Sequence, residues 1–418
     1  MKLPPLVLRH AEQVLKEVLQ FKGPADALIS RYFRGHAKLG MRERGAVAES
    51  VYRVLRNRLV YNNLAESGQG PQSRRLALLS LSDIYGVDAL SGLSEGEQVW
   101  LEHIQVIDRG QLPARLRTNL PDWLYNRLVK QYGEAETLQI ADVLNTPAPL
   151  DLRVNSLKNR REDVVKVLQE VPVDCEMTPY AASGIRLAKK IALQNMPLFK
   201  NGGVEVQDEG SQLLAQIVGA RRGELVVDFC AGAGGKTLAL GATMRNTGRL
   251  YAFEVSEKRL SNMKPRLARS GLSNVHPVKI AHEHDARIKR LARKADRGLV
   301  DSPCSGLGTL RRNPDLKWRQ TEDAIAEMNG KQREILASAA RLVKPGGRLV
   351  YATCSLLEDE NEQVVADFLA KDDRFALVPM HQVLAEAKID LEMGDYLKLM
   401  PHKHQTDGFF AAVLERKK

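Results

Sequence analysis

Two cysteines are the residues of this sequence best placed for chemistry. Cys304 stands in DSPCSG (residues 301–306) and Cys354 stands in YATCS (residues 351–355). Each segment follows a stretch predicted to be a strand, and each cysteine is followed by serine. Because the carboxyl ends of strands in an open α/β sheet face the ligand crevice, we expect both thiols to border one cleft. A cysteine alone is more often a small core residue, but this shared placement favours a nucleophile.

A glycine-rich segment, DFCAGAGGKT (residues 228–237), joins a buried apolar strand to a helix. It is not a P-loop, because Cys230 occupies the position where that motif requires its first glycine. The glycines at 232, 234 and 235 do not give the G-x-G-x-x-G pattern of dinucleotide-binding folds either. A nucleoside without a pyrophosphate therefore fits this loop better.

The next strand ends in an acid, Glu254. A carboxylate at that position can accept hydrogen bonds from both hydroxyls of a ribose, as in dinucleotide-binding folds. The glycine-rich loop and this acid together indicate S-adenosylmethionine as the cofactor.

Composition excludes several classes of protein. The chain has 418 residues, a net charge of +11 and 44% hydrophobic residues, so it is long enough for two or three domains and too apolar for a disordered chain. There is no run of 18 apolar residues and no convincing signal peptide, so we expect neither a membrane span nor secretion. Four scattered cysteines exclude a disulfide scaffold and fit a reducing cytoplasm, and no Cys/His spacing suits zinc.

The order of predicted elements indicates three parts. Residues 1–145 are expected to form an all-α domain, residues 146–205 a small α+β module, and residues 206–418 a doubly wound α/β domain. In the last part we predict strands over 225–230, 249–255, 275–280, 298–301, 347–353, 375–379 and 409–415. The predicted helices between them cover 237–244, 258–270, 324–343 and 361–369.

Several stretches together resemble one known family. VVDFCAGAGGKT, DSPCSGLGTLRRNPDLKWR, YATCSLLEDENEQ, VQDEGSQ and LDLRVN are similar to motifs of the Sun-type RNA (cytosine-5)-methyltransferases, and the layout resembles the bacterial RsmB branch. The likeness runs from about Leu150 to the C-terminus. The N-terminal helices are similar in placement to a NusB-like RNA-binding domain, more weakly, and look shortened between Tyr85 and Pro121. The resemblance implies a Rossmann-like methyltransferase domain, and it implies that the small module over residues 146–205 binds RNA.

The resemblance also implies roles for individual residues. In that family the cysteine of the Thr-Cys-Ser motif, here Cys354, adds to C6 of cytosine, and Cys304 takes part in releasing the adduct. Asp301 is implied to contact the N3/N4 edge of the base, and Lys236 to line the same pocket. The implied S-adenosylmethionine site comprises Cys230, Ala231, Gly232, Ala233, Gly234, Gly235, Lys236, Glu254, Asp285 and Asp301.

The sequence departs from the family pattern at two places. Family members usually have proline at position 233, where this chain has alanine, so we expect a more flexible loop. The third-strand acid normally follows glycine, whereas Asp285 follows His284. His282 and His284 have no third ligand nearby, so no metal is expected.

Charge points to the partner. Residues 286–319 contain ten Lys/Arg and three Asp/Glu, a net charge of +7. Such a concentration suggests a polyanion, and we expect the basic residues Arg311, Arg312, Lys317 and Arg319 to hold RNA phosphates. Trp318 is either a stacking platform for a base or a core residue.

The activity that the resemblance implies is transfer of a methyl group to cytosine C5, forming 5-methylcytosine in 16S rRNA. Two alternatives remain from the sequence: the same chemistry on tRNA, and a non-catalytic RNA-binding ribosome assembly factor. The paired cysteines argue against the second alternative, because a scaffold needs neither. A monomer is the default expectation.

Overall fold

The computed structural model describes residues 2–189 and 191–418, which form two compact units. The first, called here the helical unit, comprises Met1–Pro147 and Thr309–Thr321. The second, called the sheet unit, comprises Ala148–Gly308 and Glu322–Lys418. A short segment from within the α/β part of the sequence thus belongs to the helical unit.

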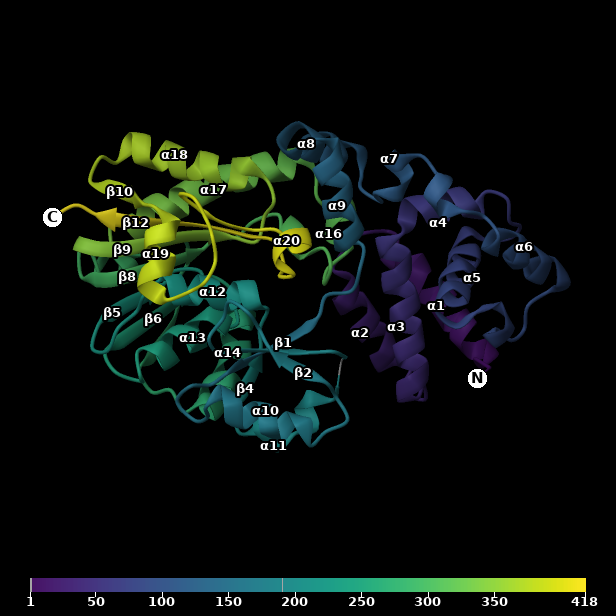
Figure 1. The fold of residues 1–418 in the computed structure, drawn as a ribbon, viewed down its shortest axis with the longest axis horizontal. Coiled ribbons are helices and arrows are strands. Elements are labelled where there is room, and N and C mark those ends of the chain that lie inside the picture. Colours follow the sequence, from purple (N-terminus) through teal and green to yellow (C-terminus); the bar gives the residue numbers. More distant parts are fainter. Residues whose placement is uncertain (1, 190) are drawn as a thin grey trace. The chain divides into compact units, whose positions relative to one another are not determined.

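The helical unit is built around the amphipathic helices α1 and α3 and the central helix α5, which is buried without a break over residues 76–82 (Figure 1). Apolar residues of α1 recur every three or four positions and are buried, as in Val7, Ala11, Val14 and Val18. The helices of this unit are α1 Pro5–Val18, α2 Ala25–Gly35, α3 Met41–Arg56, α4 Arg58–Ala65, α5 Gln72–Tyr85, α6 Glu95–Gln105, α7 Ala114–Arg117, α8 Asp122–Tyr132, α9 Glu134–Leu144 and α16 Leu316–Arg319, with 3-10 turns η1 Val87–Ala89 and η2 Arg109–Gln111.

The basic segment 309–321 packs into the helical unit, which corrects the prediction that its side chains hold RNA phosphates. Lys317 is 1% exposed, and its Nζ donates to the carbonyl oxygen of Arg56 (3.1 Å) and to Oδ1 of Asn145 (2.7 Å). Arg311 is also buried, and Trp318 donates from its indole to the carbonyl oxygen of Leu55 (2.8 Å). Burial lowers the pKa of Lys317 well below its usual value. The prediction is therefore wrong for Lys317 and Arg311, and Trp318 is a packed residue.

This placement makes Lys317 a stability residue. Lys317→Glu should lower the free energy of unfolding of the helical unit by about 3 kcal/mol or more, because it puts an unpaired carboxylate against two hydrogen-bond acceptors. Thermal denaturation followed by circular dichroism measures this effect. Lys38→Glu, at an exposed lysine of the same unit, is the matched control and should leave the transition unchanged. An unaltered transition for Lys317→Glu combined with weaker RNA binding would restore the phosphate-contact interpretation.

The main sheet of the sheet unit has the order β10-β12-β9-β8-β5-β6-β7, with β11 paired to β12. β5 to β9 run parallel, and β12 runs antiparallel to β9, β10 and β11. From β5 the chain first builds β6 and β7 on one side and then returns to build β8 on the other. The strands are β5 Leu225–Asp228, β6 Arg249–Glu254, β7 Val275–Lys279, β8 Ala295–Asp301, β9 Val343–Thr353, β10 Phe375–Val378, β11 Leu397–Leu399 and β12 Phe409–Arg416.

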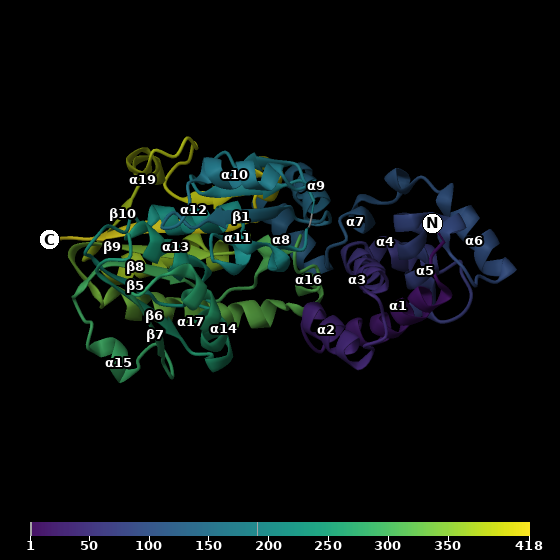
Figure 2. The ribbon, with the colours of Figure 1, turned by 90° about the horizontal axis from the view of Figure 1, so that it is seen from below.

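Helices cover both faces of this sheet (Figure 1), and the view from below looks onto α12, α13 and α14 (Figure 2). Neighbouring residues of β6 show the two-sided burial, since Leu250 and Ala252 pack on one face and Phe253 on the other. One face carries α12 Glu209–Ile217, α13 Gly235–Thr243, α14 Glu257–Ser270 and α19 Met380–Ala387, and the other carries α17 Glu322–Ala340 and α18 Glu362–Lys371. Short helices complete the unit: α15 Ala286–Lys289, α20 Pro401–His404, η4 Leu307–Thr309 and η5 Glu358–Glu360.

The predicted Rossmann-like α/β class is confirmed, with all seven predicted strands of this part present. The sequence pattern missed β11 and α19, which lie between the last two predicted strands. The switch in chain direction between β5 and β8 opens a crevice at the carboxyl ends of these strands, where ligands bind in such folds.

A second, smaller sheet precedes the main one. Its order is β2-β3-β1-β4, all antiparallel, and it has its own core around Leu152, Val164 and Ile185. The elements are β1 Leu150–Val154, β2 Cys175–Met177, β3 Gly184–Leu187, β4 Val204–Val206, α10 Arg161–Gln169, α11 Pro197–Lys200 and η3 Leu193–Asn195. The division of the chain into three domains stays a prediction.

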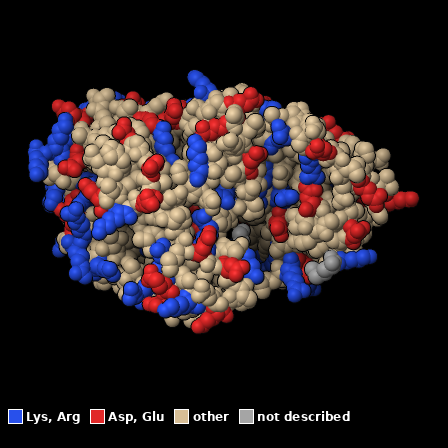
Figure 3. Space-filling model, in the orientation of Figure 1, with Lys and Arg blue, Asp and Glu red and all other residues tan. Residues whose placement is uncertain are grey.

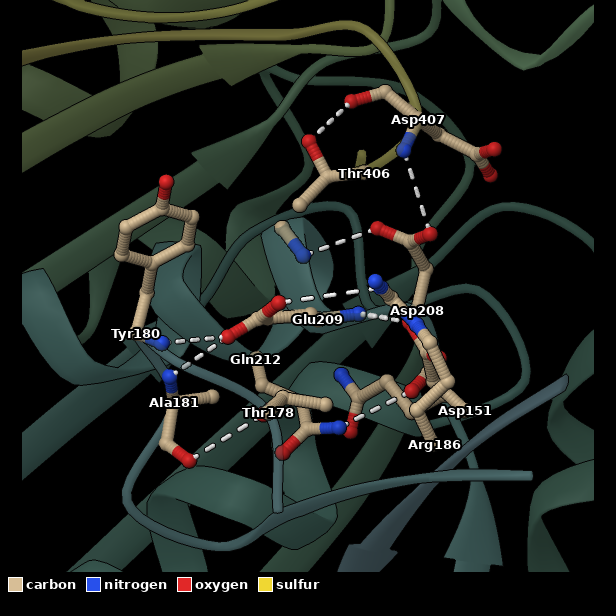
Figure 4. A network of polar contacts seen from close by, with 12 residues as sticks. Asp151, Thr178, Tyr180, Ala181, Arg186, Asp208, Glu209, Gln212, Thr406 and Asp407 are labelled. Atoms are coloured by element: carbon tan, nitrogen blue, oxygen red, sulfur yellow. Dashed lines mark hydrogen bonds and ion pairs between the residues drawn. The ribbon is translucent and has the colours of Figure 1, made fainter. Parts of the chain in front are cut away.

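Buried ionic contacts join the small sheet to α12 (Figure 4). The Arg186 guanidinium donates to both oxygens of Asp151, at 2.8 and 3.0 Å, and lies 3.7 Å from a carboxylate oxygen of Glu209. The other oxygen of Glu209 accepts the backbone N–H groups of Tyr180 (2.6 Å) and Ala181 (2.9 Å). Since Glu209 is fully buried, these partners hold the small sheet in one position on the main domain.

A second contact in Figure 4 reaches the strand ends that carry the cysteines. Asp208 accepts the backbone N–H of Asp407 at 3.2 Å, which anchors the segment before β12. Next along the chain, Gly408 donates to the carbonyl oxygen of Gly308 (2.8 Å), and Gly308 donates to that of Cys354 (2.9 Å). A Cβ on Gly308 would lie 2.1 Å from the Gly408 oxygen, so the close approach of these segments requires glycine.

Candidate active site

The glycine-rich loop between β5 and α13 is held in a left-handed turn. Gly232 and Gly234 have φ of 57° and 86°, and a Cβ on Gly234 would come within 2.6 Å of the Met263 side chain. The loop is tied on both sides: Gly232 donates its N–H to Glu254 (2.9 Å), and Arg266 donates to the carbonyl oxygen of Ala233 (2.7 Å). These ties hold the loop in a chain that lacks the family's proline at position 233.

Glu254 lies at the carboxyl end of β6 and is 3% exposed. One of its oxygens accepts the Gly232 N–H, and the other accepts the backbone N–H of Ser256 at 2.8 Å. A carboxylate oxygen can accept more than one hydrogen bond, so capacity remains for two hydroxyl donors. The structure thus brings Glu254 and the glycine-rich loop together, as the sequence predicted.

Asp228 is a residue of this crevice that the sequence reasoning did not select. Its Oδ2 accepts the hydroxyl of Thr237 (2.7 Å), whereas the buried Oδ1 has no hydrogen-bond partner in the described part of the chain. Burial is the main cause that raises the pKa of Asp228 to about 7. A buried carboxyl with a free acceptor at the end of β5 fits a site that receives a polar, positively charged ligand.

Asp285 has a local structural role. Its two oxygens accept the backbone N–H groups of Ala281 and Arg287, both at 2.9 Å, so that it caps α15. These backbone hydrogen bonds lower the pKa of Asp285 below its usual value. It lies beyond β7, the strand next to β6, and its role at the cofactor stays a prediction.

The two cysteines meet, as predicted from their positions at the ends of β8 and β9. Their sulfur atoms are 3.3 Å apart, and the backbone N–H of Cys354 points to Sγ of Cys304 at 3.3 Å. The hydrogen bond with Cys354, together with burial, raises the pKa of the Cys304 thiol well above its usual value. Either sulfur can be the donor in this contact.

Beside the sulfur pair, Lys236 and Asp301 form an ion pair with Nζ 2.8 Å from Oδ2. Burial opposes the charge on Lys236, but the attraction of Asp301, and to a smaller degree of Cys354, raises the pKa of Lys236 overall. The ammonium also lies 5.7 Å from the centre of the Phe409 ring. The pocket that holds the two sulfur atoms therefore also holds a lasting positive charge.

Glu360 joins the two cysteine segments, and the sequence reasoning did not find it. It is fully buried, and its carboxylate accepts the Ser305 N–H (2.8 Å), the Ser305 hydroxyl (2.5 Å), the Ser355 hydroxyl and the Gln332 amide (3.0 Å). The serines are the residues directly after Cys304 and Cys354. The one signal in the sequence was this repeated Cys-Ser pair, because a run of acidic residues such as EDENE normally suggests a solvated surface.

No group of three potential metal ligands occurs among the described residues, His282 and His284 included. No helix within residues 2–189 and 191–418 is long and apolar enough to cross a membrane. The four cysteines are all free thiols.

The Rossmann-like sheet, the tied glycine-rich loop and the acid at the end of β6 define an S-adenosylmethionine-dependent methyltransferase. The comparisons with known proteins give the family. The family described as 16S rRNA methyltransferase RsmB/F matches residues 215–415, and a ferredoxin-like domain of RsmF/B-like methyltransferases matches residues 120–194.

Individual relatives support the same family. A probable ribosomal RNA small subunit methyltransferase B from Synechocystis is 31% identical over 96% of this chain and 98% of its own. A ribosomal RNA small subunit methyltransferase B from Yersinia pseudotuberculosis is 34% identical over 71% of this chain and 66% of its own.

Solved structures show the same likeness. The structure of PH0851 superposes with a TM-score of 0.79 at 27% identity over all of both chains. A methyltransferase homolog from Pyrococcus horikoshii gives a TM-score of 0.63 at 30% identity, over 74% of this chain and all of that one. The protein belongs to the RsmB/F family of RNA methyltransferases.

The cofactor site can be tested through Glu254. Glu254→Ala should raise the Kd for S-adenosylmethionine at least tenfold, since two ribose hydrogen bonds to a charged acceptor, worth about 1.5–3 kcal/mol each at most, are lost. Isothermal titration calorimetry measures the Kd. Glu322→Ala, at an exposed acid of α17, is the control and should bind like wild type. Equal affinities for the Glu254 variant and wild type would remove Glu254 from the cofactor site.

Proposed function

We propose that this protein transfers a methyl group to C5 of a cytosine in small-subunit (16S) ribosomal RNA, through a covalent adduct between the RNA and Cys354. The observation that carries this proposal is the pair of sulfur atoms 3.3 Å apart at the ends of β8 and β9, next to the Lys236–Asp301 ion pair. A simple binding protein needs no such pair. The names of the relatives, which are small-subunit rRNA methyltransferases, support the choice of RNA.

The residues of the crevice fit S-adenosylmethionine. Glu254 is suited to the ribose hydroxyls, and the loop from Cys230 to Lys236 lets the backbone approach the ligand without side chains in the way. Asp228 offers a buried, unpartnered oxygen to a polar group. Asp285 lies beyond the end of β7, Asp301 is the last residue of β8, and both complete the predicted set. When bound, S-adenosylmethionine supplies a methyl group on a positively charged sulfur.

Cytosine C5 is a poor nucleophile, and Cys354 overcomes this. Its thiolate adds to C6, and the electron pair of the C5–C6 double bond moves into the ring and makes C5 nucleophilic. Asp301 contacts the N3/N4 edge of the base and stabilises the activated ring, and Lys236 keeps Asp301 in place. The attack is given to Cys354 because the family resemblance assigns it to the cysteine of the Thr-Cys-Ser motif, and Cys304 lies in contact with that sulfur.

The adduct then has to break down. Once C5 carries the methyl group, loss of the C5 proton to a base restores the double bond and expels the Cys354 sulfur from C6. Cys304, in contact with that sulfur, takes part in this release step. The target base must leave its stack to reach the crevice, which favours a flexible or locally opened region of the RNA.

An assay with radiolabelled S-adenosylmethionine tests the substrate. We expect label in unmodified 16S rRNA and none in tRNA, since the relatives act on small-subunit rRNA. Label in tRNA alone would keep the proposed chemistry but would make tRNA the substrate in place of 16S rRNA. Absence of label in every RNA, with S-adenosylmethionine still bound, would favour a non-catalytic assembly factor.

A further inference from the structure

The basic run at residues 286–319 has a part that the site does not use. Its second half is packed in the helical unit, whereas Arg293 and Lys294 are exposed and directly precede β8. This places them at the edge of the main sheet where the parallel strands begin, called here the amino edge. The cysteines, Glu254 and the glycine-rich loop lie at the opposite edge, where those strands end.

Other basic side chains gather at the amino edge. Arg222 precedes β5, Arg249 begins β6, and Arg341 precedes β9. The strand pairing brings these starts together, since Leu225 pairs with Arg249 and the backbone N–H of Arg293 donates to the Arg341 carbonyl oxygen at 2.9 Å. The exposed cations of this edge are Arg221, Arg222, Arg249, Arg293, Lys294, Arg341, Lys344, Arg374, Lys417 and Lys418.

The C-terminal strand adds to this surface because it runs antiparallel. β12 ends here, with Arg416 opposite Phe375, and Lys417 donates its backbone N–H to Arg374 at 2.8 Å. Figure 3 shows Lys and Arg side chains gathered along the left edge of the molecule, the side on which Figure 1 places the C-terminus. The amino edge is therefore a continuous feature of the sheet unit.

Few of these charges are neutralised. Three of the nearby acids are already bound: Asp296 pairs with Lys344, Asp372 with Arg374 (2.6 Å), and Glu224 with the half-buried Arg297 (3.3 Å). Asp373 and Glu415 are exposed acids near the same edge, and they offset part of its charge. In contrast, in the described part of the chain no carboxylate lies within ion-pair distance of Arg222, Arg249, Arg293 or Arg341. A row of unpaired arginines creates a positive potential suited to phosphate groups.

We propose that the amino edge is a second RNA-binding surface, which holds phosphates of the substrate RNA remote from the target cytosine. This proposal rests on the proposed function for the identity of the partner. None of the large exposed hydrophobic side chains of the described residues lies on this edge, so it lacks the apolar anchors typical of protein partners and of membrane-inserting surfaces. The surface instead offers a row of arginine and lysine side chains, which suits the regularly spaced phosphates of an RNA backbone.

The position of the surface specifies the kind of RNA. β8 spans seven residues from one edge of the sheet to the other, a length of roughly 20 Å. An RNA that contacts both edges must bend around the sheet unit, so a folded RNA is expected to use the amino edge and a short strand is not. The surface thus selects structured RNA without reading its sequence.

The test uses the full chain and compares two triple variants. The first replaces Arg222, Arg249 and Arg341 by glutamine, and the second replaces Lys264, Lys279 and Lys398, three exposed lysines of the same unit away from this edge, by glutamine. Both variants have the same net charge. For the edge variant we expect the KM for a 16S rRNA transcript to rise about tenfold with unchanged kcat, and the slope of log affinity against log salt to fall by about 2 to 3, since each lost phosphate contact accounts for about 0.7–0.9. The control should keep the wild-type slope.

The proposal would be overturned if the edge variant kept the wild-type KM and salt slope. It would also be overturned if the control lost as much RNA affinity as the edge variant, because net charge alone would then explain the effect. A third outcome would assign the surface to a membrane instead: the wild-type protein binds phosphatidylserine vesicles, the edge variant does not, and both bind RNA equally well. A failure of the proposed function has a different signature, because wild type would then methylate no RNA even if the edge variant bound RNA more weakly.

Discussion

Cys354→Ala is expected to abolish both methyl transfer and the covalent RNA adduct. Without the Cys354 sulfur no nucleophile adds to cytosine C6, so C5 is never activated and the reaction stops before any bond forms. Methyl transfer is measured with radiolabelled S-adenosylmethionine, and the adduct by denaturing electrophoresis of protein incubated with RNA. We expect a loss of at least 1,000-fold in rate, the scale at which removing a member of a catalytic set acts.

Cys304→Ala is the matched variant, since it removes an identical sulfur 3.3 Å away. It should also lose turnover, but the adduct should accumulate because the release step fails. Both variants should unfold near the wild-type temperature, since each loses a single sulfur atom. Adduct trapped by the Cys354 variant and absent from the Cys304 variant would reverse the two roles. Full methylation by both variants would remove thiol catalysis from the mechanism.

Glu360→Gln should reduce kcat by about 100-fold while leaving the Kd for S-adenosylmethionine unchanged. The substitution puts an amide donor where the carboxylate accepts the Ser305 and Ser355 hydroxyls, so the segments carrying the two cysteines shift relative to each other. Misplacement of a reacting group by about 1 Å can cost this much in rate. Glu360 is thus a positioning residue, and Glu334→Gln, at an exposed acid of the same unit, is the control.

A double-mutant cycle separates positioning from general destabilisation. In a protein with Ser305→Ala and Ser355→Ala, the Glu360→Gln change should reduce kcat far less than in wild type, because the contacts that it breaks are already gone. An effect of Glu360→Gln that is undiminished in the serine variant would contradict the role of Glu360 as the link between the cysteine segments.

Local pattern was sufficient to predict the main sheet. Apolar strands such as Leu225–Asp228, each followed by a helix, specify a parallel sheet by themselves, and a parallel sheet places all its carboxyl strand ends at one edge. For this reason the proximity of Cys304 and Cys354 could be anticipated from residue types and order, whereas the placement of Lys236 in the same pocket came from the family resemblance. The division of labour between the two cysteines came from the family resemblance.

Long-range packing was what the sequence could not provide. Lys317 has the charge of a surface residue, but its neighbours bind partners far away in the sequence. Asp315 accepts the N–H of Ala25, 290 positions away, and Trp318 donates to Leu55. These contacts hold the whole segment in the helical unit. Glu360 is another charged residue whose burial depends on partners distant in sequence. The net charge of residues 286–319 therefore did not reveal which cations are buried: Lys317 and Arg311 pack in the helical unit, whereas Arg293 and Lys294 are exposed.

The central claim is the identity of the methylated atom, and nucleoside mass spectrometry tests it most directly. An unmodified 16S rRNA transcript is incubated with the protein and S-adenosylmethionine carrying a deuterated methyl group, then digested to nucleosides. The proposed mechanism predicts 5-methylcytidine as the labelled product, at no more than one equivalent for each modified site, and none with Cys354→Ala. Label in a 2′-O-methyl nucleoside, in N4-methylcytidine or in a methylated purine would contradict it, because none of these products requires addition of Cys354 to cytosine C6.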